Sequence, residues 1–269
     1  MSRRVLITGA AGGIGSAATR AMRAQGARVV GLDLHDDPEG DIIGCDLTDP
    51  EQVKRGVAQA VERLGGLDVL VNNAGLGTPQ SAGVEPDPGA LRVLEVNLIA
   101  PWRVTAAALP ALREAAGRAR VVNVSSGLAF LTVPFATAYT ISKRGIVAYS
   151  DALRLEHGDK IDVTTVYPGY IKTGIHDAAA SEGLALEGAV PEEPIGSAAR
   201  VLARAALAER PVRDLATTRR GTVQYAVLRR VPRRLIDRLT TAGVRRAVKQ
   251  GGFARSTIAA DFVRRVRES

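Results

Sequence analysis

The chain has one cysteine, three histidines and no apolar run of about twenty residues. A lone cysteine cannot form a disulfide within the chain, and Cys45 lies in an apolar run, so we expect a buried, inert thiol rather than a nucleophile. The histidines, His35, His157 and His176, lack the spacing of a zinc site, and no metal is expected. Because no run is long enough to cross a bilayer, and the start leads directly into a strand-like pattern, we expect a cytoplasmic protein.

Lysine is also scarce, since only five of the 36 basic residues are lysines, and the charge is unevenly distributed. Residues 210–269 contain sixteen Arg or Lys and four Asp or Glu, a net +12, whereas residues 1–209 have a net charge of −4. In segments 227–239 and 244–248, leucine, valine and isoleucine recur at helical intervals among arginines, which is typical of basic amphipathic helices. Such helices could cover the sheet or the substrate site, lie weakly on an anionic membrane, attract an acidic substrate or carrier, or bind nucleic acid non-specifically. We expect no sequence-specific binding to nucleic acid.

The length and composition are sufficient for one enzyme-sized domain, because 269 residues that are 46% hydrophobic can bury a large core. Six apolar runs have the composition of buried strands, at 5–8, 29–32, 42–45, 69–71, 121–124 and 163–166. Helix-like stretches alternate with them, near 14–25, 50–64, 88–114 and 136–157. This alternation predicts an α/β fold with a parallel sheet, whose ligands bind at the carboxyl ends of the strands. Pro101 should kink or break the third helix unless it lies at a turn.

A glycine-rich turn separates the first predicted strand from the first helix. The run Thr-Gly-Ala-Ala-Gly-Gly-Ile-Gly places Gly9, Gly13 and Gly15 there, with Ile14 at the start of the helix. Glycines let the backbone turn sharply, and they let a diphosphate approach the amide groups at the positive end of the helix. This turn therefore indicates a dinucleotide site.

Asp33 ends the second predicted strand, 18 residues after Gly15. A carboxylate at this distance can accept hydrogen bonds from the hydroxyl pair of a ribose, whereas it would repel a 2′-phosphate. Neither Leu34 nor Gly12 supplies a compensating cation, so the sequence favours NAD over NADP. The alternative is that Asp33 is a solvated carboxylate in an acidic turn.

Tyr139 and Lys143 are four residues apart in a predicted helix, so their Cβ atoms should lie roughly 5–6 Å apart on one face. A free tyrosine has a pKa near 10, and a neighbouring cation favours the phenolate and lowers that value. Lys143 would therefore make Tyr139 a usable general acid or base. The alternative is an ordinary surface helix on which the two residues are paired by accident.

Together these motifs resemble the short-chain dehydrogenase/reductase family, in its compact single-domain form, over roughly residues 4–205. The resemblance implies a Rossmann-like, doubly wound parallel sheet flanked by helices on both faces. It also implies an NAD(P)-dependent oxidoreductase that acts on CH–OH groups and transfers a hydride between nicotinamide and a secondary alcohol or ketone.

The resemblance assigns the catalytic roles. Ser126, thirteen residues before Tyr139, matches the serine that positions the substrate oxygen, and Tyr139 matches the residue that exchanges a proton with it. Lys143 matches the lysine that also holds the nicotinamide ribose. Asn97 matches the asparagine that holds a proton-relay water near the lysine.

The resemblance also implies cofactor contacts from three further segments. Asp46 and Leu47 would lie against the adenine. Asn73, Ala74 and Gly75 would lie beside the adenine ribose. The nicotinamide carboxamide would be contacted by Pro168, Gly169, Ile171 and Thr173. Each segment taken alone could instead be a helix cap or a strand-ending turn.

The substrate is less visible in the sequence. Segment 174–194 resembles the family's substrate lid in position. A set of apolar residues could line a pocket for a lipophilic alcohol or ketone, or could equally be ordinary core: Leu128, Phe130, Val133, Phe135, Tyr170, Ile175, Leu184 and Leu186.

We expect residues 1–209 to form the catalytic domain and residues 210–269 a basic, helical extension packed on or near the substrate side. The common family ending in Asp-Gly-Gly, which packs a tetramer, is missing after Arg210. Family habit still implies a homodimer or homotetramer that pairs helices 88–114 and 136–157.

Two other functions stay open at this point. One is a non-catalytic, nucleotide-sensing protein with the same fold, and the other is a membrane-surface member of the family that acts on lipid-like substrates. The complete set of Ser126, Tyr139 and Lys143 argues against the first. A sugar-nucleotide dehydratase or epimerase is disfavoured, because such relatives usually have a longer carboxyl-terminal domain and a different glycine spacing.

Overall fold

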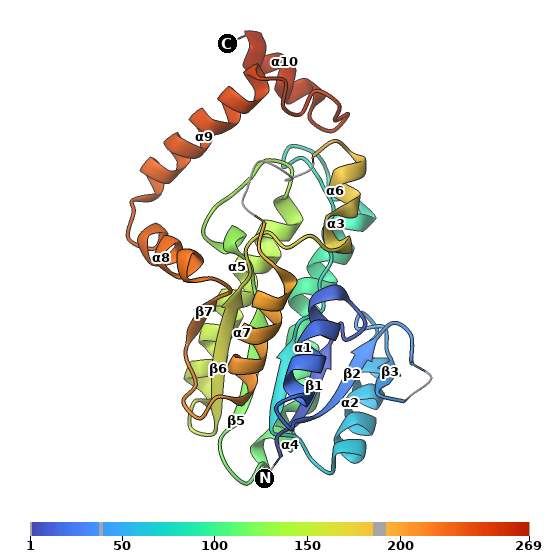
Figure 1. The fold of residues 1–269 in the computed structure, drawn as a ribbon. Coiled ribbons are helices and arrows are strands. Elements are labelled where there is room, and N and C mark those ends of the chain that lie inside the picture. Colours follow the sequence, from blue (N-terminus) through green and yellow to red (C-terminus); the bar gives the residue numbers. More distant parts are fainter. Residues whose placement is uncertain (1, 38–39, 185–191, 269) are drawn as a thin grey trace.

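The structure, a computed structural model, describes residues 2–37, 40–184 and 192–268. Within these residues seven strands form one parallel sheet, and they are β1 (Arg4–Thr8), β2 (Arg28–Asp33), β3 (Ile42–Gly44), β4 (Val69–Asn72), β5 (Ala119–Val124), β6 (Ile161–Tyr167) and β7 (Asp214–Ala216). Their order in the sheet is β3-β2-β1-β4-β5-β6-β7 (Figure 1). The strand order reverses between β1 and β4, which is where doubly wound sheets bind their ligands. The predicted Rossmann-like fold is thereby confirmed.

Helices lie on both faces of this sheet (Figure 1). The α-helices of the described residues are α1 (Gly13–Arg23), α2 (Pro50–Leu64), α3 (Pro88–Leu94), α4 (Ala100–Arg113), α5 (Thr137–His157), α6 (Asp177–Ser181), α7 (Ile195–Leu207), α8 (Arg219–Leu228), α9 (Arg233–Lys249) and α10 (Ala260–Glu268). One core packs α2, α4 and α5 against the sheet, and the other packs α1 and α7 against its opposite face. Side chains alternate along β1 accordingly, because Leu6 belongs to the first core and Val5 and Ile7 to the second.

The stretch predicted as one helix over 88–114 is divided into α3, a π-helical turn at Glu95–Ile99, and α4. Pro101 lies in the first turn of α4, directly after the wider π turn. A proline is tolerated in a first helical turn, where its missing N–H is least needed, so the helical path continues past it.

The segment beyond residue 209 contains both sheet and helix. Strand β7 pairs with β6 and completes the sheet, although the sequence did not predict a strand there. The basic segment 227–239 is not one helix, because Pro232 separates α8 from α9. The expected boundary between a catalytic domain, residues 1–209, and a carboxyl-terminal extension stays a prediction. Strand β7 lies beyond that boundary and is part of the same sheet.

The helix α9 lies outside the layered body and links α8 to α10 (Figure 1). A small apolar cluster holds this end of the chain in place, since Val248, Val263 and Val266 pack with Phe135 and Leu184. Across the described residues, none of the helices has the length and apolar character needed to span a lipid bilayer.

Candidate active site

The glycine turn after β1 needs glycine at two positions. Gly9 has a φ of +67°, and a Cβ there would lie 2.8 Å from the Ala74 Cα atom. A Cβ on Gly15 would lie 1.9 Å from the carbonyl oxygen of Gly9. No side chain caps α1, which begins at Gly13, and Gly13 and Ile14 in its first turn line the cavity. These are the features of an anion cradle at a helix N-terminus.

Asp33 lies at the end of β2 and lines the same cavity. Its carboxylate accepts hydrogen bonds from the backbone N–H groups of Ala11 and Leu34, each at 2.8 Å. A carboxylate offers about four acceptor positions, so two remain for the hydroxyl groups of a ligand. Asp33 therefore both shapes the glycine turn and presents free acceptors to the cavity.

Asp46 and Leu47 follow β3 and also line the cavity. The Asp46 carboxylate accepts from the backbone N–H of Thr48 at 2.9 Å and from its hydroxyl at 2.8 Å. The backbone hydrogen bond, followed by the hydroxyl and the nearby Arg92, holds the pKa of Asp46 below its ordinary value. The predicted buried thiol is confirmed next to it, because Cys45 is 1% exposed and burial raises its pKa to about 11.

Asn73 ties the carboxyl ends of β1 and β4 together. Its side-chain amide donates to the carbonyl oxygens of Thr8 at 3.0 Å and Gly9 at 3.3 Å. In return the Thr8 hydroxyl accepts from the backbone N–H groups of Asn73 and Ala74. The segment predicted to contact the cofactor, which also includes Gly75, lines one edge of the cavity.

Ser126, Tyr139 and Lys143 converge on the opposite part of the cavity. Ser126 follows β5, where its hydroxyl accepts from the N–H of Leu128 at 3.2 Å, and it also interacts with the Tyr139 phenol through a side-chain hydrogen bond. The Nζ atom of Lys143, one helical turn after Tyr139, lies 5.6 Å from the centre of the tyrosine ring. The neighbouring Ser125 has a structural role, because its hydroxyl donates to the Lys143 carbonyl at 2.7 Å.

The electrostatics of this cluster differ from the sequence-based expectation. Burial raises the pKa of Tyr139 above its ordinary value, and the hydrogen bond with Ser126 opposes this only in part. Burial also lowers the pKa of Lys143 to about 8, and its Nζ atom donates to the carbonyl oxygen of Val124 at 3.0 Å. The expected lowering of the Tyr139 pKa by Lys143 is therefore wrong. Spacing along a helix predicts proximity but not the cost of desolvating a phenolate.

Asn97 lies behind the cavity wall, in the π turn between α3 and α4. Its side chain donates to the carbonyl oxygen of Leu76 at 2.8 Å and to Ser142 Oγ at 3.2 Å, and it accepts from the N–H of Leu76 at 2.7 Å. Asn97 and Lys143 approach the same point, since a Cβ on Gly75 would lie 3.4 Å from Asn97 Oδ1 and 3.5 Å from Lys143 Nζ. Its relay role stays a prediction.

The Pro-Gly turn after β6 depends on Glu193, which the sequence analysis missed. The N–H of Gly169 donates to Glu193 Oε2 at 3.2 Å and to the Thr217 hydroxyl at 3.3 Å. The hydroxyls of Thr217 and Thr218 donate to the same carboxylate. Pro168, together with Ile171 and Thr173 further along this segment, lines the cavity as predicted. No spacing rule could reveal this contact, because it joins segments 24 residues or more apart.

The cavity that these groups enclose has a volume of about 900 Å³. Of the apolar residues proposed for its wall, four line it: Leu128, Val133, Tyr170 and Ile175. Phe130, Phe135 and Leu184 instead pack in apolar clusters beside it, and Leu186 lies outside the described residues.

Helix α8, in the segment expected to pack on or near the substrate side, supplies a further wall of the cavity. Four of its residues at helical spacing, Arg220, Gln224, Tyr225 and Leu228, line the cavity. A Cβ on Gly127, next to Ser126, would lie 2.4 Å from the Tyr225 hydroxyl oxygen. The helix therefore covers the loop that carries the serine.

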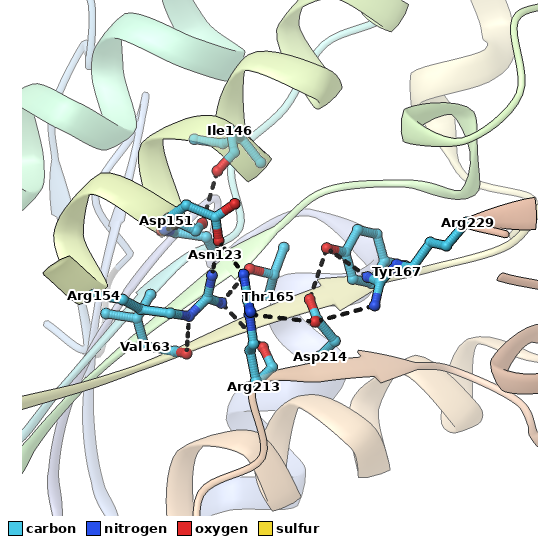
Figure 2. Close-up of polar contacts among 11 residues, drawn as sticks. Asn123, Ile146, Asp151, Arg154, Val163, Thr165, Tyr167, Arg213, Asp214 and Arg229 are labelled. Carbon is cyan, nitrogen blue, oxygen red and sulfur yellow. Dashed lines mark hydrogen bonds and ion pairs between the residues drawn. The ribbon is translucent and has the colours of Figure 1, made fainter. Parts of the chain in front are cut away.

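Helix α8 is anchored at both ends. Thr218 caps its first turn, because its hydroxyl accepts from the N–H of Gly221 at 3.0 Å. At the other end Arg229 donates to Asp214 at 3.2 Å and to the Tyr167 hydroxyl at 3.3 Å, and Tyr167 itself donates to Asp214 at 2.8 Å (Figure 2). The Arg229 guanidinium also lies 5.5 Å from the centre of the Tyr167 ring. The same network continues through Arg213, so the wall is fixed to the sheet (Figure 2).

Comparison with known proteins identifies similar chains. A family model described as short chain dehydrogenase matches residues 3–183. A rat protein named dehydrogenase/reductase SDR family member 7B is 32% identical over 64% of this chain, and the match spans only 58% of that protein's length. The D-beta-hydroxybutyrate dehydrogenase of Rhizobium meliloti is 28% identical over 71% of this chain and 82% of its own length.

Solved structures share the fold. A short chain dehydrogenase from Burkholderia cenocepacia in complex with NADP has a TM-score of 0.73 and 24% identity, over 89% of this chain and 99% of its own. A short chain dehydrogenase/reductase from Burkholderia phymatum in complex with NAD has a TM-score of 0.72 and 22% identity, over 85% of this chain and 92% of its own.

Proposed function

The chain belongs to the short-chain dehydrogenase/reductase family, and we propose that it transfers a hydride between NAD and a lipophilic secondary alcohol or ketone. The observation that carries this proposal is the convergence of Ser126, Tyr139 and Lys143 on one cavity of about 900 Å³ that also contains the glycine cradle. A protein that only senses a nucleotide would not need that convergence.

The residues present fit a dinucleotide, because a Cβ on Gly9 or Gly15 would fill the cradle in which a diphosphate would lie. In this proposal the amides at the start of α1 hold the diphosphate, and Asp33 holds the adenine ribose. Residues Pro168 to Thr173 hold the nicotinamide end. When bound, the cofactor supplies the nicotinamide C4 position, which accepts or releases the hydride.

The protein groups handle the substrate oxygen and its proton. Ser126 donates a hydrogen bond to that oxygen and holds it beside Tyr139. During oxidation the Tyr139 phenolate takes the hydroxyl proton as the hydride leaves the carbinol carbon, and during reduction the phenol returns it. Lys143 holds the nicotinamide ribose beside Tyr139, and Asn97 holds the water through which the proton reaches solvent.

The choice of NAD rests on Asp33, whose two remaining acceptor positions suit a pair of ribose hydroxyls and repel a phosphate. The similar Burkholderia structures were solved with NADP in one case and NAD in the other, so the fold accommodates both. The residue at the end of β2 is therefore the feature that supports NAD for this chain.

The proposed substrate class rests on the cavity wall beside Ser126. The described apolar residues Leu128, Leu131, Val133, Tyr170 and Leu228 line it. Apolar walls with a few convergent polar groups are typical of sites for lipophilic molecules. The similar Rhizobium enzyme, by its name, acts on a secondary alcohol, which agrees with this class of reaction.

We also propose a homodimer through α4 and α5, and a cytoplasmic location. Trp102 on α4 is 61% exposed, and its ring centre lies 5.8 Å from that of Tyr149 on α5. The two side chains border an apolar hollow of about 440 Å³. An exposed tryptophan beside such a hollow is typical of a protein interface. Trp102→Arg should convert a dimer into a monomer in sedimentation equilibrium.

The test of the main proposal is turnover. Purified protein would be incubated with NAD and a panel of sterols, retinoids, acyl alcohols and polyols while the absorbance of the reduced cofactor is followed. Oxidation of a lipophilic secondary alcohol supports the proposal. Tight NAD binding without turnover of any panel member would instead support the nucleotide-sensing function.

A further inference from the structure

One side of α9 combines leucines with unpaired cations. Leu235 and Leu239 are four residues apart on one face, and they are 47% and 65% exposed. Arg238, Arg246 and Lys249 follow at helical spacing on the same side and are exposed. The opposite side is less exposed, since Ile236, Thr240, Val244 and Ala247 lie there. The helix therefore turns an apolar and basic face to solvent.

The outer face of α8 is similar. Val223 and Val227 are 66% and 53% exposed, although the same helix lines the cavity with Gln224 and Leu228. Exposed aliphatic side chains at i and i+4 on two successive helices are unlike the scattered apolar residues of an ordinary surface. One side of α8 thus faces the candidate substrate and the other side faces solvent.

The charge of this surface is largely uncompensated, because Arg229 has a carboxylate partner in Asp214 but, among the described residues, Arg238 and Arg246 have none. Residues 219–249 contain ten Arg or Lys and only one acidic residue, Asp237. Several arginines elsewhere are paired with carboxylates, as in the 2.8 Å contact between Arg4 and Asp68. Within the part of the chain that the structure describes, neither Arg238 nor Arg246 forms an ion pair. This face therefore attracts anions.

The same part of the chain is tied to the rim of the candidate active site. Phe135, two residues before the first turn of α5, packs its ring against Phe253 and Phe262 at 5.9 and 5.6 Å between ring centres. The hydroxyl of Thr257 donates to Glu182, next to α6, at 3.2 Å. These contacts join the carboxyl-terminal helices to the loops beside Tyr139. A partner bound to α8 and α9 would therefore lie close to the mouth of the cavity.

We propose that the outer faces of α8 and α9 bind the surface of an anionic phospholipid membrane. Arginines would contact lipid phosphates and headgroups, and Val223, Val227, Leu235 and Leu239 would enter the acyl boundary. This inference deepens the proposed function and rests on it in one respect, since docking would bring the cavity to the source of a lipophilic substrate.

Other occupants fit this face less well. A second copy would bring two strongly basic faces together, which is repulsive. Non-specific binders of single-stranded nucleic acid combine their cations with aromatic side chains for base stacking, and the exposed apolar residues on this face are aliphatic. Aliphatic residues among cations are the composition of helices that lie in a membrane interface.

The experiment is co-sedimentation of the full chain with vesicles. One set would be phosphatidylcholine alone, and the other would contain about one third phosphatidylglycerol. The expected result is at least about tenfold more protein bound to the anionic vesicles, with binding reduced by high salt. The proposal would be overturned by equal binding to both sets of vesicles or by binding to neither. It would also be overturned if the protein bound nucleic acid, or associated with itself, without binding vesicles.

Variants separate the apolar and charged contributions. Two double variants should each reduce vesicle binding at least about fivefold. One replaces both leucines, Leu235→Ser with Leu239→Ser, and the other replaces two arginines, Arg238→Gln with Arg246→Gln. Matched controls are Leu155→Ser on α5, where the leucine is 88% exposed, and Arg200→Gln on α7. Unchanged binding in both double variants would contradict the inference. Turnover of a water-soluble substrate should be the same in all four variants, so loss of docking is distinguishable from loss of the reaction.

Discussion

The carboxylate of Glu193 accepts a hydrogen bond from the backbone N–H of Gly169, at 3.2 Å. The same carboxylate accepts from the hydroxyls of Thr217 and Thr218, so one acidic side chain joins the Pro-Gly turn after β6 to the start of α8. The two walls of the cavity are therefore coupled through a residue of segment 174–194 to which the sequence analysis gave no role of its own.

Glu193→Gln should loosen this junction, because an amide has one acceptor oxygen where three donors converge. We expect the KM for NAD to rise about threefold to tenfold, with kcat within about twofold of the unmutated protein, as for a residue that positions the cofactor site. Steady-state kinetics measure both parameters. Glu209→Gln, an exposed carboxylate near β7, should leave both unchanged, and a fall in kcat at constant KM in Glu193→Gln would contradict the positioning role.

Gly15→Ala should damage the cofactor cradle. The added Cβ would lie 1.9 Å from the carbonyl oxygen of Gly9, so the turn must move. NAD affinity should fall at least about tenfold, because the amides of the first helical turn would no longer point at one anion. The measurement is calorimetric titration with NAD. Gly117→Ala is the control, since nothing lies within 4 Å of its Cβ, and equal NAD affinity in both variants would count against the cradle.

The raised pKa of Tyr139 sets the sign of the pH dependence. Below that pKa the phenol keeps its proton, which suits reduction, whereas oxidation requires the phenolate. The value of kcat/KM for oxidation should therefore increase steadily between about pH 6 and 9, while the value for reduction should be flat or decrease. Comparison of the two directions over this range checks the assignment. An oxidation rate that is already level at neutral pH would contradict a raised pKa.

Lys143 should cause a separate pH effect, on the free energy of unfolding rather than on the reaction rate. Burial lowers its pKa to about 8 from an unfolded value of 10.5, so between these values the unfolded chain binds more protons than the folded one. Stability should therefore rise with pH across this window. In Lys143→Met this rise should be smaller, and thermal unfolding at several pH values measures it. An identical slope in both proteins would show that Lys143 is not desolvated.

Asp33→Ala should weaken NAD binding and relax discrimination against NADP, because the variant loses both the ribose acceptors and the repulsion of a 2′-phosphate. The ratio of the two dissociation constants should shift toward NADP by about tenfold or more. Asp37→Ala, on the loop after β2, serves as the control for loss of charge. Equal affinity of the unmutated protein for both cofactors would refute the choice of NAD.

Much of the fold could be predicted from the sequence because the decisive signals are local. Apolar runs identified six strands, and the glycine turn identified the point where β1 leads into α1. Strand β7 was missed because it has only three residues, all partly exposed, and begins with an aspartate. Its pairing with β6 depends on contacts that span almost fifty residues of chain.

The site was predicted in part for the same reason. The helical spacing of Tyr139 and Lys143 and the position of Ser126 placed all three correctly on one cavity. The role of Glu193 and the particular residues of α8 that line the cavity could not be predicted, because they depend on tertiary contacts. The raised pKa of Tyr139 was also missed, since desolvation depends on packing that no spacing rule contains.

The most direct test of the proposed reaction is Tyr139→Phe, which removes one oxygen atom and keeps the ring. With a substrate that the unmutated protein oxidises, formation of reduced cofactor is measured by absorbance, and NAD affinity is measured separately by titration. The account predicts a loss of at least about 10²-fold in kcat with NAD affinity within about threefold of the unmutated protein. Turnover within about threefold of the unmutated protein would contradict the assignment of Tyr139 as the group that exchanges the substrate proton.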